Sequence, residues 1–272
     1  MAKNIFIGAI TANEEIQENI FLMKVVLPSS FGDPLPGQFV MIRISGLSEP
    51  FLSRPLSIYS FSRQNDSCLI QLLYSVVGKG TQILAGLIGG SQVEIHGPLG
   101  RSFEIDETRK KVVFIAGGMG IAPLSLLIEH LCRDKCFSRQ ALTLYLGART
   151  EKTVVGLDKL QKLCYGVNVC TDDGSLGKKG LVTKIFRQDL GKYLPSETSI
   201  YACGPAEMLK SLAKILSRGK FFAQVSLEER MACGIGACLG CAVALRDEKG
   251  ALTYRRVCAD GPIFNLREVI WK

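Results

Sequence analysis

The sequence has only two histidines and no apolar run long enough to cross a membrane. Its longest stretch without a charge, residues 112–128, is shorter than the about 20 apolar residues of a spanning helix, and three glycines and a proline interrupt it. We interpret this stretch as a strand, a loop and a helix of a core. His96 lies in a strand-rich segment and His130 in a predicted helix, so we expect structural roles for both, and we predict no catalytic residue in this chain.

A secretion signal is also missing from the sequence. The apolar run at residues 5–10 is too short for a signal-peptide core, and no small-residue cleavage site follows it. We therefore expect a cytoplasmic protein without a membrane partner, in which thiols stay reduced. With 272 residues, 47% of them apolar and 21% charged, the chain is typical of a globular protein of more than one module.

Basic residues exceed acidic ones by eight, but no basic stripe interleaved with aromatic residues is present. The sequence therefore lacks the usual pattern of a nucleic-acid-binding protein, and we expect no nucleic-acid partner. The excess lies in residues 107–220, which carry a net charge of +9, against −2 before them and +1 after them. Such local positive potential suits a phosphate-bearing small ligand, and a lysine-rich solvated surface explains it equally well.

Two sequence patterns divide most of the chain into two parts. Residues 1–106 contain β-rich segments, such as residues 20–28, separated by Gly, Pro, Asn and Asp, which predicts a small antiparallel barrel or sandwich of five to seven strands. Residues 107–220 alternate short apolar strands with amphipathic helices, which predicts a parallel-sheet nucleotide-binding domain. Pro123 is expected at the first position of one of these helices. Residues 221–272 form a third, cysteine-rich module.

Four cysteines of this last module have the spacing of an iron–sulfur site. Cys233, Cys238, Cys241 and Cys258 form the pattern C-x4-C-x2-C-x16-C. Four thiolates are the complete ligand set of a 2Fe-2S cluster, and the first three match the plant-type ferredoxin spacing. The small residues between them, Gly234, Gly236, Ala237 and Gly240, let the backbone fold closely around an inorganic core and donate N–H groups to its sulfurs.

Zinc and disulfides account for these thiols less well. Structural zinc prefers two separated CxxC-like pairs, whereas this segment has one such pair, a third cysteine on the same loop and a distant fourth. Disulfides would require an oxidising compartment. The remaining cysteines, apart from one, are interpreted as small core residues: Cys68, Cys132, Cys136, Cys164 and Cys170.

A glycine-rich turn between a strand and a helix predicts the dinucleotide site. Gly117, Gly118 and Gly120 would let a pyrophosphate approach the helix N-terminus, although the turn is not a GxGxxG fingerprint and also suits a simple tight turn. Asp172 and Asp173 follow a later strand. They would accept hydrogen bonds from an adenosine ribose and repel a 2′-phosphate, which favours NAD; a turn or helix-cap role is equally compatible.

A chain with a nicotinamide site and a one-electron cluster needs an intermediary, because a hydride carries two electrons and the cluster accepts one at a time. A flavin does both. In the barrel segment, Arg54 is a candidate for a phosphate contact, Ser57 and Tyr74 are hydroxyl partners, and Gly78, Gly80 and Thr81 form a small turn.

The order of these motifs resembles the ferredoxin reductase superfamily. The motifs are "RPLS", "GKGT", "GGMGIAPL" and "CGPAEM", and the terminal "EERMACGIGACLGCAV" and "VCADGPIF" narrow the resemblance to the electron-transfer subunits of type B dihydroorotate dehydrogenase. The resemblance implies FAD in the barrel, with contacts at Arg54, Pro55, Leu56, Ser57, Leu73, Tyr74, Ser75, Gly80 and Thr81. Leu56 stands where the superfamily has a tyrosine. Cys203, followed by Gly204, would lie near the nicotinamide or would be a buried strand cysteine.

The resemblance also implies a function. Electrons would pass from the FMN of a separate catalytic subunit through the cluster and FAD to NAD+, in pyrimidine (UMP) biosynthesis and in a heterotetramer. The isolated chain would show only diaphorase activity. Two alternatives remain open: a similar relay subunit of a ferredoxin–NADP transhydrogenase, sulfide dehydrogenase or hydrogenase, and a zinc-stabilised nucleotide sensor.

Overall fold

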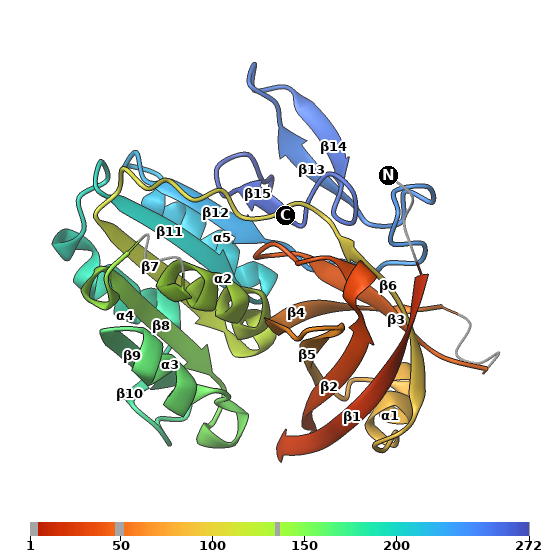
Figure 1. The fold of residues 1–272 in the computed structure, drawn as a ribbon. Coiled ribbons are helices and arrows are strands. Elements are labelled where there is room, and N and C mark those ends of the chain that lie inside the picture. The colour runs from red at the N-terminus through yellow and green to blue at the C-terminus, as the bar shows by residue number, and fades with distance from the viewer. Residues whose placement is uncertain (1–4, 47–51, 134–136, 272) are drawn as a thin grey trace.

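A closed antiparallel barrel forms the first part of the chain in a computed structural model that describes residues 5–46, 52–133 and 137–271 (Figure 1). Its strands within the described residues follow the order β1-β2-β5-β4-β3-β6, with β1 pairing back to β6. Their bounds are β1 (Ile5–Gln17), β2 (Ile20–Pro28), β3 (Phe39–Ile44), β4 (Arg54–Arg63), β5 (Ser67–Ser75) and β6 (Gln92–Leu99). The predicted small barrel is confirmed.

Alternation of side chains fills this barrel. Along β2, Met23, Val25 and Leu27 point inward and are almost completely buried, because successive side chains of a strand face opposite sides. A short helix, α1 (Lys79–Ala85), follows β5, and its Leu84 packs into the same core. The sequence predicted only a turn here. Gly80 and Thr81 instead form the first turn of α1, with Thr81 Oγ1 accepting the N–H of Val77 at 2.9 Å.

The second part is a sheet covered by helices on both faces. In the described residues its strand order is β10-β9-β8-β7-β11-β12-β15, parallel except for the last strand. The bounds are β7 (Lys111–Gly117), β8 (Leu142–Ala148), β9 (Gly166–Thr171), β10 (Lys178–Lys179), β11 (Thr198–Cys203), β12 (Phe222–Ser226) and β15 (Ile263–Asn265). The parallel nucleotide-binding architecture is confirmed.

Strand β7 shows why its sequence is apolar throughout. Val112 and Phe114 pack with helices α2 (Ile121–Arg133) and α3 (Leu157–Leu163) on one face, whereas Val113 and Ile115 pack with α4 (Val182–Asp189) and α5 (Ala206–Leu216) on the other. Pro123 is the third residue of α2, not the first as predicted. It is tolerated there because the first four N–H groups of a helix have no partner within the helix.

The C-terminal segment is partly built into the sheet. Strand β12 extends the parallel sheet beside β11, and β15 adds antiparallel to β12 (Figure 1). Between them, a loop carries the first three clustered cysteines and a hairpin of β13 (Ala242–Arg246) and β14 (Leu252–Arg256) projects from the body. The division into residues 1–106, 107–220 and 221–272 remains a prediction.

Helix α2 lies between the sheet and the barrel (Figure 1). Its Glu129 accepts the hydroxyl of Ser60 on β4 at 3.0 Å and forms an ion pair with Lys159 of α3 at 2.6 Å. The Lys159 ammonium also lies 4.1 Å from the centre of the Tyr59 ring on β4. These contacts fix the barrel against the sheet, so a cavity between them has a defined shape.

Candidate functional site

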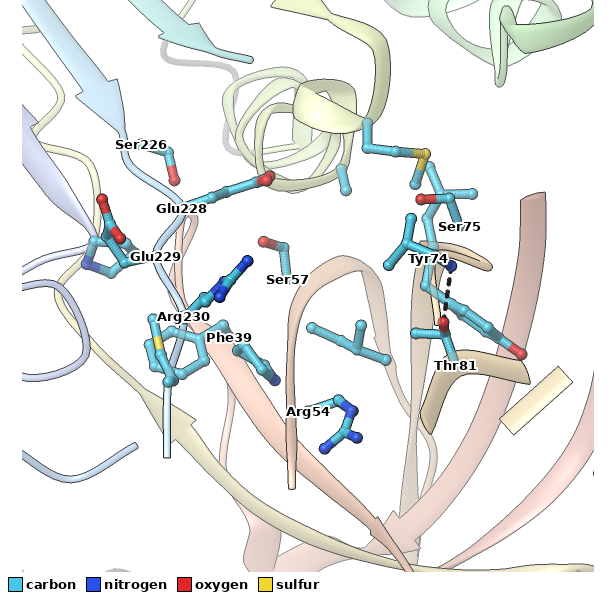
Figure 2. A pocket seen from close by; sticks show the side chains of 18 of the residues that line it. Phe39, Arg54, Ser57, Tyr74, Ser75, Thr81, Ser226, Glu228, Glu229 and Arg230 are labelled. Atoms are coloured by element: carbon cyan, nitrogen blue, oxygen red, sulfur yellow. Dashed lines mark hydrogen bonds between the residues drawn. The ribbon is translucent and has the colours of Figure 1, made fainter. Parts of the chain in front are cut away.

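A cavity of about 900 Å³ lies where the barrel meets the chain that follows strand β12 (Figure 2). Its size is within the range of small-molecule sites. It is lined by eight of the nine residues for which the sequence predicts flavin contacts, namely Arg54, Pro55, Leu56, Ser57, Leu73, Tyr74, Ser75 and Thr81. The walls are mostly apolar with a few polar groups, which is the usual composition of a small-molecule site.

The ninth predicted residue, Gly80, is not part of the cavity wall but determines where Arg54 lies. A Cβ at Gly80 would lie 2.2 Å from Arg54 Nε, so the guanidinium packs directly on the bare backbone of helix α1. Arg54 also donates to the carbonyl of Leu52. The guanidinium is therefore held at the cavity, ready for a bidentate contact with a phosphate.

This packing gives a first prediction. In the Gly80→Ala variant the added methyl group displaces the flexible Arg54 side chain. We expect FAD to bind about 10–100-fold more weakly, because the complex loses one charge-assisted hydrogen bond, which contributes about 1.5–3 kcal/mol. Titration of the apoprotein with FAD, followed by flavin fluorescence, measures this. Gly86→Ala, at the end of the same helix, is the control because its Cβ would meet only an ordinary contact at 3.5 Å. Equal affinity in the two variants would contradict the role of Arg54.

Leu56, in place of the family's tyrosine, is buried at the cavity wall. Phe39 and Tyr74 are also among the residues that line this cavity, but the ring of Tyr74 is buried in the barrel core, where it stacks on Phe21. The Tyr74 hydroxyl donates to Asn13 Oδ1 at 3.0 Å, and burial raises the pKa of Tyr74 to about 12, so this hydroxyl stays neutral. Of the aromatic residues at this wall, Phe39 is therefore the one that could take the place of a tyrosine at position 56.

Several residues of the cavity wall were not predicted from the sequence, because they belong to segments far along the chain from the barrel motifs. Met119 follows the glycine-rich turn, and the segment after β12 contributes Ser226 and residues 227–231. Figure 2 shows Glu228 and Arg230 pointing in one direction and Glu229 in the opposite one. The only sequence signal was the position of this segment, directly before the clustered cysteines.

A second cavity of about 620 Å³ lies at the carboxyl ends of the parallel strands. Ligands of open parallel sheets bind at this edge. Of the residues predicted to contact NAD, five line it: Gly117, Gly118, Gly120, Asp172 and Gly204. Arg149 lies in the same wall as Asp172. Ser75, Met119 and Glu228 line both cavities, so the two cavities adjoin at these three residues.

Two predicted NAD contacts are placed elsewhere. Asp173 is outside the cavity and accepts hydrogen bonds from the N–H and hydroxyl of Ser175 at 3.0 and 2.7 Å, which is the turn role that the sequence also allowed. Cys203 is completely buried at the end of β11 and does not line the cavity. Its Sγ lies 4.0 Å from Oε1 of Glu228, a residue that lines both cavities.

The cysteine loop begins at the wall of the first cavity. Met231 lines this cavity, and Cys233 follows two residues later, at most about 7 Å along the backbone. Gly234, with φ +68°, packs on the barrel: a Cβ there would lie 2.4 Å from Cγ of Met41. Glycine is therefore required at this point, and the loop is seated beside the cavity.

The thiols of the predicted cluster differ in environment. Cys233 is partly buried, Cys238 is exposed, and Cys241 and Cys258 are buried. Burial opposes ionisation of Cys233, but the N–H groups of Ile235, Cys238 and Ala237 outweigh it and lower its pKa to about 6. Burial and the neighbouring Cys241 thiol raise the pKa of Cys258 to about 12.

Backbone amides thus favour an anionic sulfur on this loop, and they are the donors that stabilise cluster sulfurs. The N–H of Ile235 lies 3.5 Å from Cys233 Sγ, and that of Cys258 lies 3.4 Å from Cys241 Sγ. Among the described residues, no three Cys, His, Asp or Glu side chains already have the geometry of a metal site. The donor set suits iron chemically, and the four ligands remain a prediction.

An ion pair braces the cysteine loop. Arg256 binds both carboxylate oxygens of Asp260, at 2.9 and 3.1 Å, and donates to the carbonyl of Gly236 at 2.9 Å. The Arg256 guanidinium beside Asp260 lowers the pKa of that carboxyl to about 2. A carboxyl with a lowered pKa contributes its stability above its unfolded pKa of about 3.9 and loses it as the pH falls towards 2. At pH 7 the contribution is complete.

The Asp260→Asn variant is therefore expected to loosen the loop at pH 7. Losing about 1–2 kcal/mol of local stability corresponds to about 5–30-fold faster release of iron to a chelator under anaerobic conditions. Glu248→Gln, on the exposed hairpin of the same module, is the control for the change in charge. Iron release at the wild-type rate in Asp260→Asn would show that the ion pair does not brace the loop.

Comparison with known proteins agrees with this arrangement. Three family models match: an oxidoreductase FAD-binding domain at residues 8–103, an oxidoreductase NAD-binding domain at residues 114–214 and the iron–sulfur cluster binding domain of dihydroorotate dehydrogenase B at residues 228–270.

No helix among the described residues is long and apolar enough to cross a membrane.

Curated relatives are similar over most of the chain. The electron transfer subunit of dihydroorotate dehydrogenase B (NAD(+)) from Desulforamulus reducens is 37% identical over 98% of this chain and 99% of its own length. That from Caldanaerobacter subterraneus subsp. tengcongensis is 42% identical over 88% of each chain. A solved NADH-dependent reduced ferredoxin–NADP oxidoreductase superimposes with a TM-score of 0.82 at 28% identity, covering 97% of this chain and 90% of that one.

Proposed function

The chain belongs to the family of electron transfer subunits of dihydroorotate dehydrogenase B, and we propose that it carries electrons between a catalytic subunit and NAD+ through a 2Fe-2S cluster and FAD. The observation that carries this proposal is the continuity of the site. One cavity adjoins the predicted nicotinamide site at Ser75, Met119 and Glu228, and its wall continues within two residues into the cysteine loop.

The three parts have distinct tasks in this proposal. Barrel residues, among them Arg54 and Ser57, hold FAD. When bound, FAD exchanges hydride with the nicotinamide and single electrons with the cluster. The glycine turn and Asp172 hold NAD, and the Asp172 carboxylate disfavours a 2′-phosphate. Cys233, Cys238, Cys241 and Cys258 hold the cluster. The names of the curated relatives, which specify NAD(+), support the choice of dinucleotide.

A catalytic partner follows from the family, whose members are named as subunits. We propose that the partner contains FMN, oxidises dihydroorotate in pyrimidine synthesis and assembles with this chain as a heterotetramer. It would dock over the cysteine loop, where Cys238 is exposed beside the apolar Leu239, which is 63% exposed, and Ile235, which is 39% exposed. An apolar surface around an exposed cluster ligand suits a protein interface with a short electron path.

Reconstitution tests this function. The chain is co-expressed with a catalytic subunit that is active on dihydroorotate, and formation of NADH is followed after dihydroorotate and NAD+ are added. We expect co-purification and NADH formation that requires both subunits. A complex that reduces NAD+ only from reduced ferredoxin would instead favour the function of the ferredoxin–NADP oxidoreductase, to which this chain is structurally similar.

A further inference from the structure

Helix α2 presents one face to the barrel (Figure 1). Ala122, in its first turn, lines the first cavity, and Leu126, one turn later, packs into the barrel core. Glu129 follows on the same face, because residues three or four apart are neighbours on a helix, and it accepts the hydroxyl of Ser60 on β4 at 3.0 Å. The glycine turn that lines the second cavity leads directly into this helix. The position of α2 against the barrel therefore sets the predicted nicotinamide site relative to the flavin site.

Strand β4 is shared between the flavin cavity and the contact with the helices. Its first four residues, 54–57, line the first cavity. Its pairing with β5 is irregular between Ile58 and Ser60, where Tyr59 is an extra residue. Such a bulge changes the direction of side chains, and here Tyr59 and Ser60 both contact residues of α2 and α3. A shift of this part of β4 would thus also move the flavin contacts.

Lys159 of α3 connects these two elements. Its ammonium group forms the ion pair with Glu129 at 2.6 Å, donates to Ser125 Oγ of α2 at 3.1 Å and lies 4.1 Å from the centre of the Tyr59 ring. The Tyr59 hydroxyl packs on Gly156 at the start of α3, where a Cβ would lie 2.6 Å from it. The side chains of Lys159 and Glu129 are 32% and 17% exposed, so water screens the pair only in part. One ammonium group therefore holds β4, α2 and α3 in a single arrangement.

Two other polar contacts between the barrel and the sheet domain are weaker. Lys152 and Glu18 lie 4.0 Å apart and are both exposed, so their attraction is largely screened. Gln17 Nε2 donates to the carbonyl of Val154 over a long distance of 3.4 Å. The contact at Lys159 is therefore the stronger polar connection.

Hydride transfer is sensitive to the arrangement that Lys159 holds. The reacting atoms must come within about 3–3.5 Å, and a misplacement of about 1 Å can lower the rate about 100-fold. The predicted flavin contacts lie on the barrel and the predicted nicotinamide contacts lie on the sheet domain. The two rings can therefore approach each other only as accurately as the barrel and the sheet are held together. Lys159 lines neither cavity and would act through Tyr59 and Glu129.

We propose that Lys159 is a positioning residue of the relay: through Tyr59 and Glu129 it sets the distance and angle at which the nicotinamide meets the flavin, without contacting either ring. The inference rests on the proposed function and adds to it a determinant of hydride transfer outside both cavities.

The Lys159→Met variant of the holoprotein tests this role, because methionine has an unbranched side chain of similar length but no charge. We expect FAD and NADH, titrated separately, to bind within about twofold of the wild type, since their contacts remain. The limiting rate of flavin bleaching at saturating NADH, measured without oxygen by stopped flow, should fall about tenfold. The long-wavelength charge-transfer absorption of the stacked flavin and nicotinamide should weaken with it. Lys159→Arg keeps the charge and can stack on Tyr59, so it should restore most of both.

Lys162→Met is the matched control, since it removes the same charge from an exposed position on the same helix and should keep the wild-type rate. Ser60→Ala tests the contact from the barrel side without changing any charge, and it should lower the limiting rate about threefold. A wild-type limiting rate in Lys159→Met would overturn the assignment, as would an equal fall in Lys162→Met. If Lys159→Met does not fold, a wild-type rate in Ser60→Ala overturns it.

The binding measurements separate positioning from a direct role in binding. A slower rate in Lys159→Met that additional NADH restores fully would show weakened binding instead of misplaced rings, and would also overturn the assignment. Failure of the wild-type flavin to bleach with NADH would instead contradict the proposed function itself.

Discussion

The Cys238→Ser variant is expected to lose the cluster and to keep NADH-dependent dye reduction. Serine supplies no thiolate, so iron should fall from about two atoms per chain to near zero, and the broad visible shoulder of the cluster should disappear. In the proposed arrangement FAD binds in a separate cavity of the barrel and would still receive hydride from NADH. Reduction of a two-electron dye should therefore stay within about threefold of the wild type. Iron analysis, the visible spectrum and a diaphorase assay measure these quantities.

Cys132→Ser is the matched control for this variant. Cys132 lies on α2 outside the cysteine loop, is partly buried at the edge of the core and donates weakly to the carbonyl of Leu163 at 3.6 Å, a contact that a hydroxyl can replace. It should retain iron. Loss of dye reduction in Cys238→Ser while FAD stays bound would show that electrons do not reach the dye through FAD before the cluster, and the relay order would be wrong.

The Gly120→Ala variant is expected to damage the nicotinamide site and the fold together. A Cβ at Gly120 would lie 2.1 Å from the carbonyl oxygen of Cys203, so the turn after β7 and the turn after β11 cannot both keep their places. Such overpacking against backbone should lower the free energy of unfolding by about 3 kcal/mol. Because the same turns line the second cavity, NADH should bind at least about tenfold more weakly. Urea unfolding and NADH titration measure the two effects.

Gly191→Ala is the corresponding control in the same domain, because no atom lies within 4 Å of its added Cβ. We expect its free energy of unfolding to change by less than about 0.5 kcal/mol. If Gly120→Ala binds NADH normally and unfolds like the control, the close approach of these two turns does not form the site.

Local signals in the sequence were sufficient to predict much of the fold and the site. Strand β2 has the predicted bounds, because its apolar alternation and flanking turns are local. Each of three motifs lies within one short segment: the cysteine spacing, the "RPLS" strand and the glycine turn. Residues of the "RPLS" strand and of the glycine turn line the predicted cavities. For the same reason the order of the barrel and the parallel sheet could be predicted.

Features that depend on distant segments could not be predicted. Strand β15 joins the parallel sheet after the cysteine loop and the hairpin of β13 and β14 have intervened, and its pairing with β12 reveals this. Glu228 joins both cavities because β12 ends at the barrel, which no local pattern records. Helix α1 was missed because the glycines at its start favour a turn until Thr81 and the packing of Leu84 stabilise it.

A visible absorption spectrum tests whether one chain connects NADH, a flavin and an iron–sulfur cluster. The protein is purified without oxygen, and its spectrum is recorded before and after NADH is added. We predict flavin bands on a broad iron–sulfur shoulder, both of which bleach with NADH. A protein that stays colourless after reconstitution with iron and sulfide would contradict the relay and favour a zinc-stabilised nucleotide-binding protein.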